Sequence, residues 1–274
     1  MASPDTIIFL DQVRFGYDAT PVVDGVCANL EPGKVTALIG PNASGKTTLM
    51  RLMLGLLRPW SGTIGAVGQS VAELGPAERS RLMSYVPQRP GVRFAFTVRE
   101  VIAMGAHGQS KRVAEQRVDD AINQAGLTGL ADRVLMALSG GQQQRVLLAR
   151  AEVQSASGGR VMLLDEPGSH LDLKHRHAMM QRLRQLADDG LAVLVVLHEL
   201  DLAARYADEA WLMDAGKLVA AGPWDAVLTP NVLGPVYGLD MEQIDRKDDR
   251  PLLVVSAGLG DTMTDDSLAT QPTD

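Results

Sequence analysis

A glycine-bracketed loop with one lysine constrains the fold of this chain more than any other feature, because residues 40–48 read GPNASGKTT. The apolar run before it, Val35 to Ile39, has strand character, and residues 47–57 carry apolar side chains at helical spacing until Pro59. Glycine lets successive backbone N–H groups face one concavity, and the start of a helix adds partial positive charge there. The stretch predicts a phosphate-binding loop between a strand and a helix, rather than a turn with a solvated lysine.

The loop fits the pattern G-x-x-x-x-G-K-[ST], in which the lysine reaches the β- and γ-phosphates of a nucleotide and the hydroxyl residue ligates Mg²⁺. Lys46 and Thr47 occupy these two positions. Lys46 is expected to be an exposed charge on the loop, so that its loss removes phosphate affinity and little packing. The residues expected to contact ATP here are Gly40, Pro41, Asn42, Ala43, Ser44, Gly45, Lys46, Thr47 and Thr48.

A second chemical element is VMLLDEP at residues 161–167, an apolar strand-like run that ends in two carboxylates. Neighbouring side chains on a strand point to opposite faces, so Asp165 and Glu166 serve one site only if the strand ends there, and Pro167 favours an ending. Beside a phosphate loop, one carboxylate holds Mg²⁺ and the other orients the attacking water. The sequence therefore predicts that Asp165 binds the metal and that Glu166 polarises the water.

Strand-like and helical runs alternate along most of the chain, which predicts an α/β fold with a mostly parallel sheet. Residues 7–15 and 22–30 are expected to form an N-terminal antiparallel β layer, with turns at Asp18 and Gly25. Strand character is lost between about Val98 and Leu138, which predicts a helical subdomain at about residues 98–150.

The α/β pattern then resumes, and the whole is expected to be one domain over residues 1–255. The later strands are expected at residues 160–164, 191–197 and 210–221. Residues 256–274 are rich in Gly, Asp, Thr and Ser, and this composition predicts a disordered tail.

Composition narrows the classes of function. The net charge of −7 gives no general attraction to nucleic acid, so none is expected as a partner. One cysteine, Cys27, excludes an internal disulfide and fits a reducing compartment; it is expected to be buried. The start of the chain has no secretory signal pattern, and the longest apolar run, Leu191 to Leu197, is shorter than the ~20 residues that cross a bilayer. The expectation is a cytosolic chain that works at a membrane only as a peripheral partner.

Residues 138–145 read LSGGQQQR and open a helix. A capping box at the start of the helix would explain the serine but not the rest of the segment. Together with GPNASGKTT and LLDEP, this segment resembles the ATP-binding subunits of ABC transporters. The resemblance implies that the backbone amides of Ser139, Gly140 and Gly141, with Gln142 beside them, grip the γ-phosphate of an ATP held by the opposite subunit.

Four smaller matches follow in the order that the resemblance requires. Gln88 in SYVPQ corresponds to a glutamine that links Mg²⁺ and water to the membrane partner, and His198 corresponds to a switch histidine on the γ-phosphate. Asp172 corresponds to the aspartate of a loop that crosses between subunits. Tyr17 corresponds to an aromatic residue that stacks on adenine, although Phe15 shares its strand face and is the alternative.

The site that the resemblance implies has catalytic residues Glu166, His198, Lys46 and Gln88, and Mg²⁺ ligands Thr47, Gln88 and Asp165. Two departures from the family pattern, Ala43 in place of glycine and Gly168 in place of threonine, remove no group with an assigned chemical role.

The histidines His170, His175 and His177 suggest a metal site at first sight. Residues 174–186 have the pattern of an amphipathic helix, on which residues two apart do not share a face. A solvated helical face is therefore the favoured interpretation.

Three segments narrow the resemblance to importers of iron–siderophore complexes, haem and cobalamin: DEPGSHLDLKHRH, HELDLAARYAD and VLTPNVLGPVYGLD. The resemblance implies a homodimer on the cytoplasmic face of the inner membrane, two permease subunits and, indirectly, a substrate-binding protein. Iron–siderophore is the expected cargo, with haem or cobalamin as options.

Two alternatives stay open: a soluble ABC-type ATPase that is not coupled to transport, and the ATPase of an importer for another substrate. A kinase or GTPase with a phosphate loop has no use for LSGGQQQR, and a module that only binds nucleotide is expected to lack Glu166 or His198.

Overall fold

The computed structural model describes residues 6–88, 95–244, 250 and 252–256, and the expected tail after Ser256 lies outside these residues. A four-stranded sheet in the order β2-β1-β4-β5 forms the first layer, and its neighbouring strands are antiparallel. This confirms the expected N-terminal β layer. Its strands are β1 (Ile8–Phe15), β2 (Val23–Leu30), β4 (Ser61–Ala66) and β5 (Gln69–Ser70).

A six-stranded sheet in the order β10-β9-β3-β8-β7-β6 forms the centre of the molecule, and only β10 runs antiparallel to its neighbour. All five residues of β3 are buried, because the strand is covered on both faces; this explains its unbroken apolar sequence. The strands are β3 (Val35–Ile39), β6 (Met83–Val86), β7 (Val161–Leu164), β8 (Ala192–Val196), β9 (Glu209–Asp214) and β10 (Lys217–Pro223).

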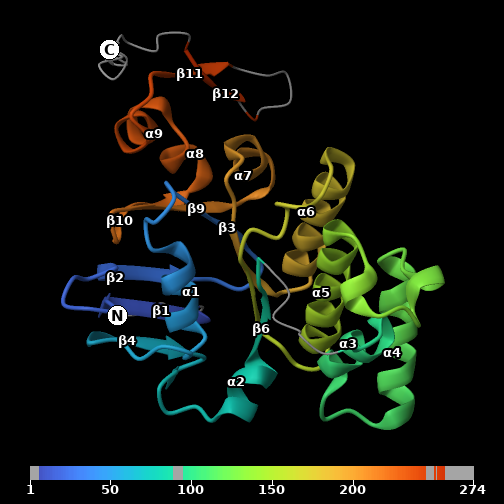
Figure 1. Cartoon of the computed structure of the whole chain (residues 1–274). Coiled ribbons are helices and arrows are strands. Elements are labelled where there is room, and N and C mark those ends of the chain that lie inside the picture. Colours follow the sequence, from blue (N-terminus) through green and yellow to red (C-terminus); the bar gives the residue numbers. More distant parts are fainter. Residues whose placement is uncertain (1–5, 89–94, 245–249, 251, 257–274) are drawn as a thin grey trace, which may run out of the picture.

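Helices cover the central sheet on two faces and extend to one side (Figure 1). The helix α1 (Lys46–Met53) packs between the two sheets, and α6 (Leu173–Asp188) and α7 (Leu200–Tyr206) pack on the opposite face of the central sheet. The short helix α2 (Pro76–Leu82) leads into β6. The predicted helix at residues 47–57 is thus confirmed, but it ends at Met53.

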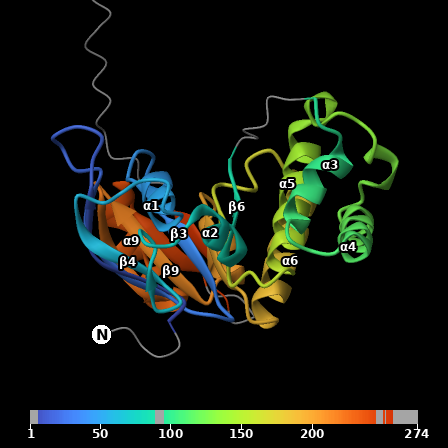
Figure 2. The same ribbon diagram turned by 90° about the horizontal axis from the view of Figure 1, so that it is seen from below.

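The helices α3 (Val98–Ala103), α4 (Lys111–Gln124) and α5 (Gly140–Ser155) stand beside the sheets as a separate arm (Figures 1 and 2). They enclose their own hydrophobic cluster, which includes Ile102, Ile122 and Leu127. Three short 3-10 helices complete the arm: η1 (Met104–Ala106), η2 (Thr128–Leu130) and η3 (Leu135–Ala137). The expected helical stretch is therefore present at the expected place.

The last described elements are two helices and a hairpin beyond the central sheet: α8 (Trp224–Val227), α9 (Pro230–Tyr237), β11 (Met241–Ile244) and β12 (Leu252–Val255). The Arg250 guanidinium donates to the carbonyls of Ala204 and Ala207 at the end of α7, at 2.8 and 3.1 Å. Within the described parts of the chain, each helix is too short or too polar to cross a bilayer.

Two local expectations were wrong. Gly25 lies inside β2 with a φ of +67°, where the pairing with β1 is irregular, and does not end the strand. Cys27 is exposed, because Val26 beside it faces the core and alternate residues of a strand face opposite sides. The Cys27 sulfur accepts hydrogen bonds from Gln12, at 3.1 Å from both its backbone N and its side-chain Nε2.

Candidate active site

The phosphate loop connects the end of β3 to the start of α1 and lies under strict backbone constraints. Gly45 has a φ of +103°, and a Cβ atom there would lie 2.5 Å from the Val22 carbonyl oxygen. Gly40 has a φ of +143°, and its Cβ would lie 2.1 Å from the Met213 carbonyl oxygen. Ala43 also adopts a left-handed backbone, with a φ of +62°, which glycine would adopt without strain. The loop thus keeps the curled backbone even where its sequence departs from the family pattern.

Lys46 is the first residue of α1 and is only 6 % exposed, so the expectation of an exposed lysine on a loop was wrong. Its Nζ donates to the carbonyl oxygens of Gly40 and Pro41, at 2.8 and 2.7 Å. Burial lowers the pKa of Lys46, and the nearby carboxylates of Glu166 and Asp165 oppose that shift. The aliphatic part of the Lys46 side chain packs inside the loop, and its ammonium group binds carbonyl oxygens of the same loop.

Asp165 lies at the end of β7 beside the phosphate loop. The Thr47 hydroxyl donates to its Oδ1 at 3.3 Å, and the Tyr85 hydroxyl donates to its Oδ2 at 3.5 Å. Asp165 is 3 % exposed, and burial raises its pKa; the hydrogen bond from Thr47 opposes this. Burial and Asp165 together raise the pKa of Tyr85 to about 12, so its hydroxyl stays protonated as a donor. Tyr85 was not predicted as a site residue. Its position two residues after Met83, in a strand that ends near the site, was the signal in the sequence that could have identified it.

Glu166 lies between two side chains that come from the ends of other strands. Its Oε2 accepts from Gln88 Nε2 at 2.5 Å, and its Oε1 lies 2.7 Å from His198 Nε2. Gln88 follows β6 and His198 follows β8, and β7 lies between these two strands in the sheet. The three groups meet because the carboxyl ends of parallel strands lie at the same edge of a sheet.

The backbone of Glu166 is strained, with a φ of +47°, a conformation that residues other than glycine rarely adopt. This conformation ends β7 and turns the Glu166 side chain away from that of Asp165. Two adjacent carboxylates therefore have different neighbours: Asp165 is buried against Thr47, and Glu166 is partly exposed beside Gln88 and His198.

The start of α5 carries the second predicted phosphate contact. Ser139 Oγ accepts from the Gln142 backbone N at 3.3 Å, and Gln142 Oε1 accepts from the Ser139 backbone N at 3.0 Å. This is a capping box, so part of the segment does serve the helix itself. Gly140 and Gly141 lie against His170, and a Cβ at Gly141 would be 2.9 Å from the His170 carbonyl oxygen.

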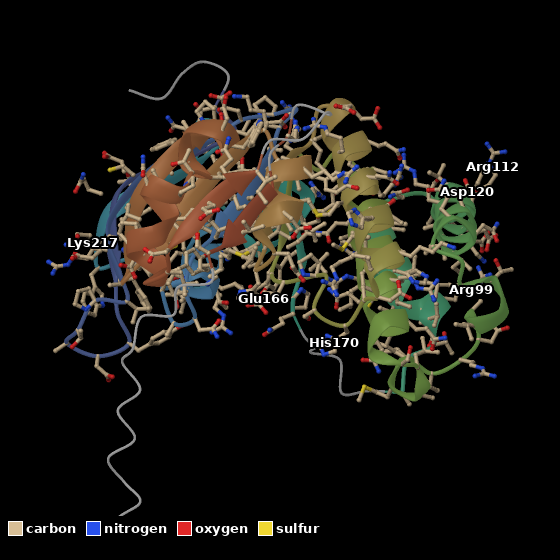
Figure 3. The ribbon with its side chains drawn as sticks, turned by 90° about the horizontal axis from the view of Figure 1, so that it is seen from above. Arg99, Arg112, Asp120, Glu166, His170 and Lys217 are labelled. Atoms are coloured by element: carbon tan, nitrogen blue, oxygen red, sulfur yellow. The ribbon has the colours of Figure 1, made fainter. Side chains whose placement is uncertain are left out.

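The segment 139–142 lines an open pocket of about 450 Å³ together with His170, Asp172 and His175. Across the described residues, hydrogen bonds and ion pairs leave this segment unconnected to the phosphate loop, and α1 and α5 stand on different sides of β6 (Figures 1 and 2). Glu166 and His170 lie along the same side of the molecule (Figure 3). One chain therefore does not bring the two predicted phosphate contacts together.

The structure distinguishes the two aromatic candidates for the adenine contact, because β1 ends at Phe15 and Tyr17 lies beyond the strand. Tyr17 is 55 % exposed, whereas Phe15 is 8 % exposed and belongs to the hydrophobic core. Their rings meet edge to face, with centroids 5.1 Å apart. Hydrogen bonding to Thr48 lowers the pKa of Tyr17, and the Tyr17 hydroxyl also accepts from Arg51 at 3.4 Å, so the ring lies beside α1.

Three histidines near the start of α6 contact separate partners. His170 Nδ1 lies 3.0 Å from Ser169 Oγ, and His177 Nδ1 lies 2.9 Å from the Tyr206 hydroxyl. His175 Nδ1 lies 2.8 Å from Asp172 Oδ1, which also accepts from the His175 backbone N at 2.8 Å. Asp172 therefore caps α6 while it stands at the edge of the pocket beside α5.

Comparisons with known proteins agree with this geometry. A family model described as "ABC transporter" matches residues 23–169. The hemin import ATP-binding protein HmuV of Pseudomonas putida is 40 % identical over 80 % of this chain and 88 % of its own length. The cobalamin import ATP-binding protein BtuD of Halobacterium salinarum is 42 % identical over 80 % of this chain and 55 % of its own length.

Among solved structures, one described as "an inward-facing conformation of a putative metal-chelate type ABC transporter" superposes with a TM-score of 0.76 at 27 % identity. The superposition covers 92 % of this chain and 98 % of the other. The family model spans the loop at residues 40–48, the helix start at Ser139 and the strand end at Asp165 and Glu166. The chain therefore belongs to the ABC transporter family, in which it is an ATP-binding ATPase subunit.

Proposed function

We propose that this chain hydrolyses ATP to drive a bacterial ABC importer for a metal chelate. The observation that carries the proposal is the position of Glu166, which is held between Gln88 and His198 at the sheet edge beside the phosphate loop. A carboxylate in that position is suited to accept a hydrogen bond from a water molecule and to direct it at the γ-phosphate.

The cargo is proposed from the relatives. Hemin and cobalamin occur in the names of two of them, and the solved transporter that superposes on this chain is described as of metal-chelate type. Iron–siderophore complexes belong to the same chemical class and were the expectation from sequence. The ATPase subunit binds the nucleotide and not the cargo, so the chelate is identified by uptake measurements and not from these residues.

Four side chains are proposed to act on ATP. Lys46 leaves the carbonyl oxygens of Gly40 and Pro41 and binds the β- and γ-phosphates, since a charge-assisted hydrogen bond to phosphate is stronger than one to a neutral carbonyl. Glu166 polarises the attacking water, and His198 contacts the γ-phosphate. Tyr17 stacks on adenine. Lys46, Glu166 and His198 thereby act at the phosphates and the water, where charge develops in the transition state, whereas Tyr17 holds the base.

The residues around Asp165 fit Mg²⁺ as the metal. A hard cation prefers oxygen ligands, and a buried carboxylate beside a hydroxyl supplies them. Thr47, Asp165 and Gln88 are the proposed ligands, and the burial that raises the pKa of Asp165 disfavours its charge until a cation is bound. When bound with ATP, Mg²⁺ neutralises charge on the β- and γ-phosphate oxygens.

The proposed assembly is a head-to-tail homodimer, because residues 139–142 lie away from the phosphate loop of their own chain. Each ATP lies between the phosphate loop of one chain and residues 139–142 of the other, with Asp172 at the subunit boundary. Closure moves two permease subunits at the cytoplasmic face of the inner membrane, and a substrate-binding protein delivers the chelate. Nucleic acid has no role in this assembly.

The test is Glu166→Gln, which keeps size and hydrogen bonding and removes the charge. We expect the variant to bind ATP, to turn it over at least ~100-fold more slowly, and to accumulate as a closed dimer. Phosphate release and light scattering with and without Mg-ATP measure both, and Glu115→Gln, on the exposed surface of α4, is the control. Normal turnover by Glu166→Gln, or a monomer at high protein concentration with ATP bound, would contradict the mechanism.

Measuring uptake of the chelate distinguishes an importer ATPase from a soluble ATPase. Cells in which Glu166→Gln replaces the native residue are expected to lose uptake of labelled hemin, cobalamin or an iron–siderophore complex. Retained uptake of all three, with ATPase activity lost in the purified variant, would favour another cargo or a soluble role.

A further inference from the structure

We infer that Arg176 is a positioning residue for ATP hydrolysis, that it fixes His198 relative to Glu166, and that Gly168 provides the space it needs. The inference rests on the roles proposed above for Glu166 and His198. It adds a residue of α6 that is not among the groups proposed to act on ATP and that the motifs of the sequence do not mark.

Arg176 connects two segments that lead to the catalytic pair. Its Nη2 and Nε donate to the Leu171 carbonyl oxygen, at 3.0 and 3.3 Å. Its Nη1 forms an ion pair with Glu199, the residue after His198. Both side chains of this pair are partly buried, so its geometry is more restricted than that of an exposed surface pair.

Gly168 lies directly under the stem of Arg176. A Cβ atom at position 168 would lie 2.9 Å from Arg176 Cγ and 3.2 Å from Arg176 Cδ. Cγ is the inner part of the side chain and has little freedom to move away. Gly168, which stands where the family has threonine, therefore leaves the space that the Arg176 side chain occupies.

These contacts close a ring of interactions around the reacting carboxylate. Glu166 contacts His198, His198 is followed by Glu199, and Glu199 pairs with Arg176. Arg176 binds the turn of residues 168–171, which begins two residues after Glu166. The ring connects the backbone that carries His198 to the turn that follows Glu166. Loss of Arg176 is therefore expected to disorder His198, while ATP contacts from the phosphate loop remain.

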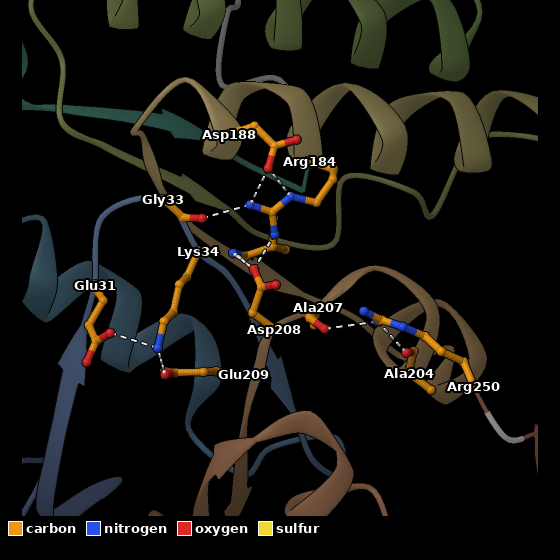
Figure 4. A network of polar contacts seen from close by, with 11 residues as sticks. Glu31, Gly33, Lys34, Arg184, Asp188, Ala204, Ala207, Asp208, Glu209 and Arg250 are labelled. Carbon is orange, nitrogen blue, oxygen red and sulfur yellow. Dashed lines mark hydrogen bonds and ion pairs between the residues drawn. The ribbon is translucent and has the colours of Figure 1, made fainter. Parts of the chain in front are cut away.

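Arg184, two turns further along α6, is a matched control. Its Nη2 donates to the Gly33 carbonyl oxygen at 2.7 Å, and its Nη1 pairs with Asp208 (Figure 4). Arg184 thus makes the same kinds of contact as Arg176, to a backbone carbonyl and to carboxylates, and it pairs with Asp188 in addition to Asp208. Gly33 and Asp208 precede β3 and β9, however, so Arg184 lies at the edge of the sheet away from Glu166.

The experiment compares Arg176→Met with Arg184→Met in the full chain. We expect Arg176→Met to lower kcat for ATP about 10-fold, as misplacement of a catalytic group does, with KM for ATP changed less than about 2-fold. Arg184→Met is expected to lower the melting temperature with kcat unchanged. Equal losses of kcat in both variants, or no loss in Arg176→Met, would overturn the inference.

Two further variants keep the test decisive. Arg176→Lys retains the charge opposite Glu199 and is expected to recover part of kcat, and it replaces Arg176→Met if that variant does not fold. Gly168→Thr is expected to lower kcat in the native background and to have a smaller effect when combined with Arg176→Met, because the two positions share one contact. Additive effects of Gly168→Thr and Arg176→Met would contradict the shared contact.

Glu166→Gln measured in parallel separates the two proposals. If Glu166→Gln is inactive and Arg176→Met is normal, only the role of Arg176 is wrong. If Glu166→Gln is itself normal, the proposed function of the site is wrong, and the inference about Arg176 falls with it.

Discussion

The two helix starts that are proposed to contact ATP, those of α1 and α5, are built differently. The start of α1 follows Gly45, whose left-handed backbone provides no side-chain cap, and it contains a buried lysine. The start of α5 follows Ser139, which forms a reciprocal capping box with Gln142. The first intrahelical hydrogen bond of α5 runs from Gln143 N to Ser139 O, which leaves the earlier N–H groups without a helical acceptor.

The difference supports the proposal that the start of α1 binds the nucleotide first. At α1 the backbone donors, Lys46 and the carboxyl group of Asp165 lie together, so one chain holds nearly all the groups for Mg-ATP. At α5 the pocket is open, and its basic side chains are Arg145, His170 and His175 rather than a lysine enclosed by the loop. The start of α5 therefore suits a phosphate that is already bound elsewhere, as the proposed dimer requires.

The largest effect is expected at α1, from Lys46→Ala. Affinity for ATP should fall at least about 100-fold, since charge-assisted hydrogen bonds contribute roughly 1.5–3 kcal/mol each. Because Lys46 is buried and donates to two carbonyls, the variant should also lose about 1–3 kcal/mol of stability without nucleotide. Calorimetric titration with ATP and thermal unfolding measure the two effects, with Lys217→Ala in β10 as the control. Unchanged affinity in a folded variant would remove the assigned role of Lys46.

A smaller and different effect is expected at α5, from Gly141→Ala. The new Cβ would lie 2.9 Å from the His170 carbonyl oxygen and shift the start of the helix. Turnover should fall about 20-fold with weaker ATP-dependent dimerisation, less than the roughly 100- to 1000-fold that follows removal of a donor, because alanine keeps the N–H group and only displaces it; a single chain should bind ATP as before. Gly129→Ala, where nothing lies near the added Cβ, is the matched control. Loss of ATP affinity in the monomer would show that both helix starts act within one chain.

The smallest effect is expected at the outer edge of the α1 site, from Tyr17→Ala. Affinity for ATP should fall about 5- to 10-fold, because stacking of an aromatic ring on a base contributes roughly 1–3 kcal/mol, and Tyr17→Phe should retain most of it. Phe15→Ala should instead lower stability by about 3 kcal/mol, as for other buried aromatic residues. Titration and unfolding of the three variants decide between the rings. A larger loss of ATP affinity in folded Phe15→Ala would reverse the choice.

The fold was predictable where the signal is local. The run at residues 35–39 became β3 with the same bounds, and the helical stretch after Val98 became a separate arm. Prediction failed for the exposure of two side chains, because exposure depends on how the backbone packs and turns. Cys27 is exposed because of how β2 pairs with β1, and Lys46 is buried because the loop carbonyls turn towards its ammonium group.

By itself, the sequence determined the chemical groups of the site and the local backbone that carries them: a strand, a glycine loop and a helix with Lys46, and a strand that ends at Asp165 and Glu166. Tertiary structure alone decided which groups meet. Gln88 and Glu166 are 78 positions apart and come within 2.5 Å because β6 and β7 are neighbours in the sheet, and Arg176 reaches Glu199 across α6 and α7. The physical reason is that backbone preferences act between near neighbours in the chain, whereas strand order is fixed by burial of the whole sheet.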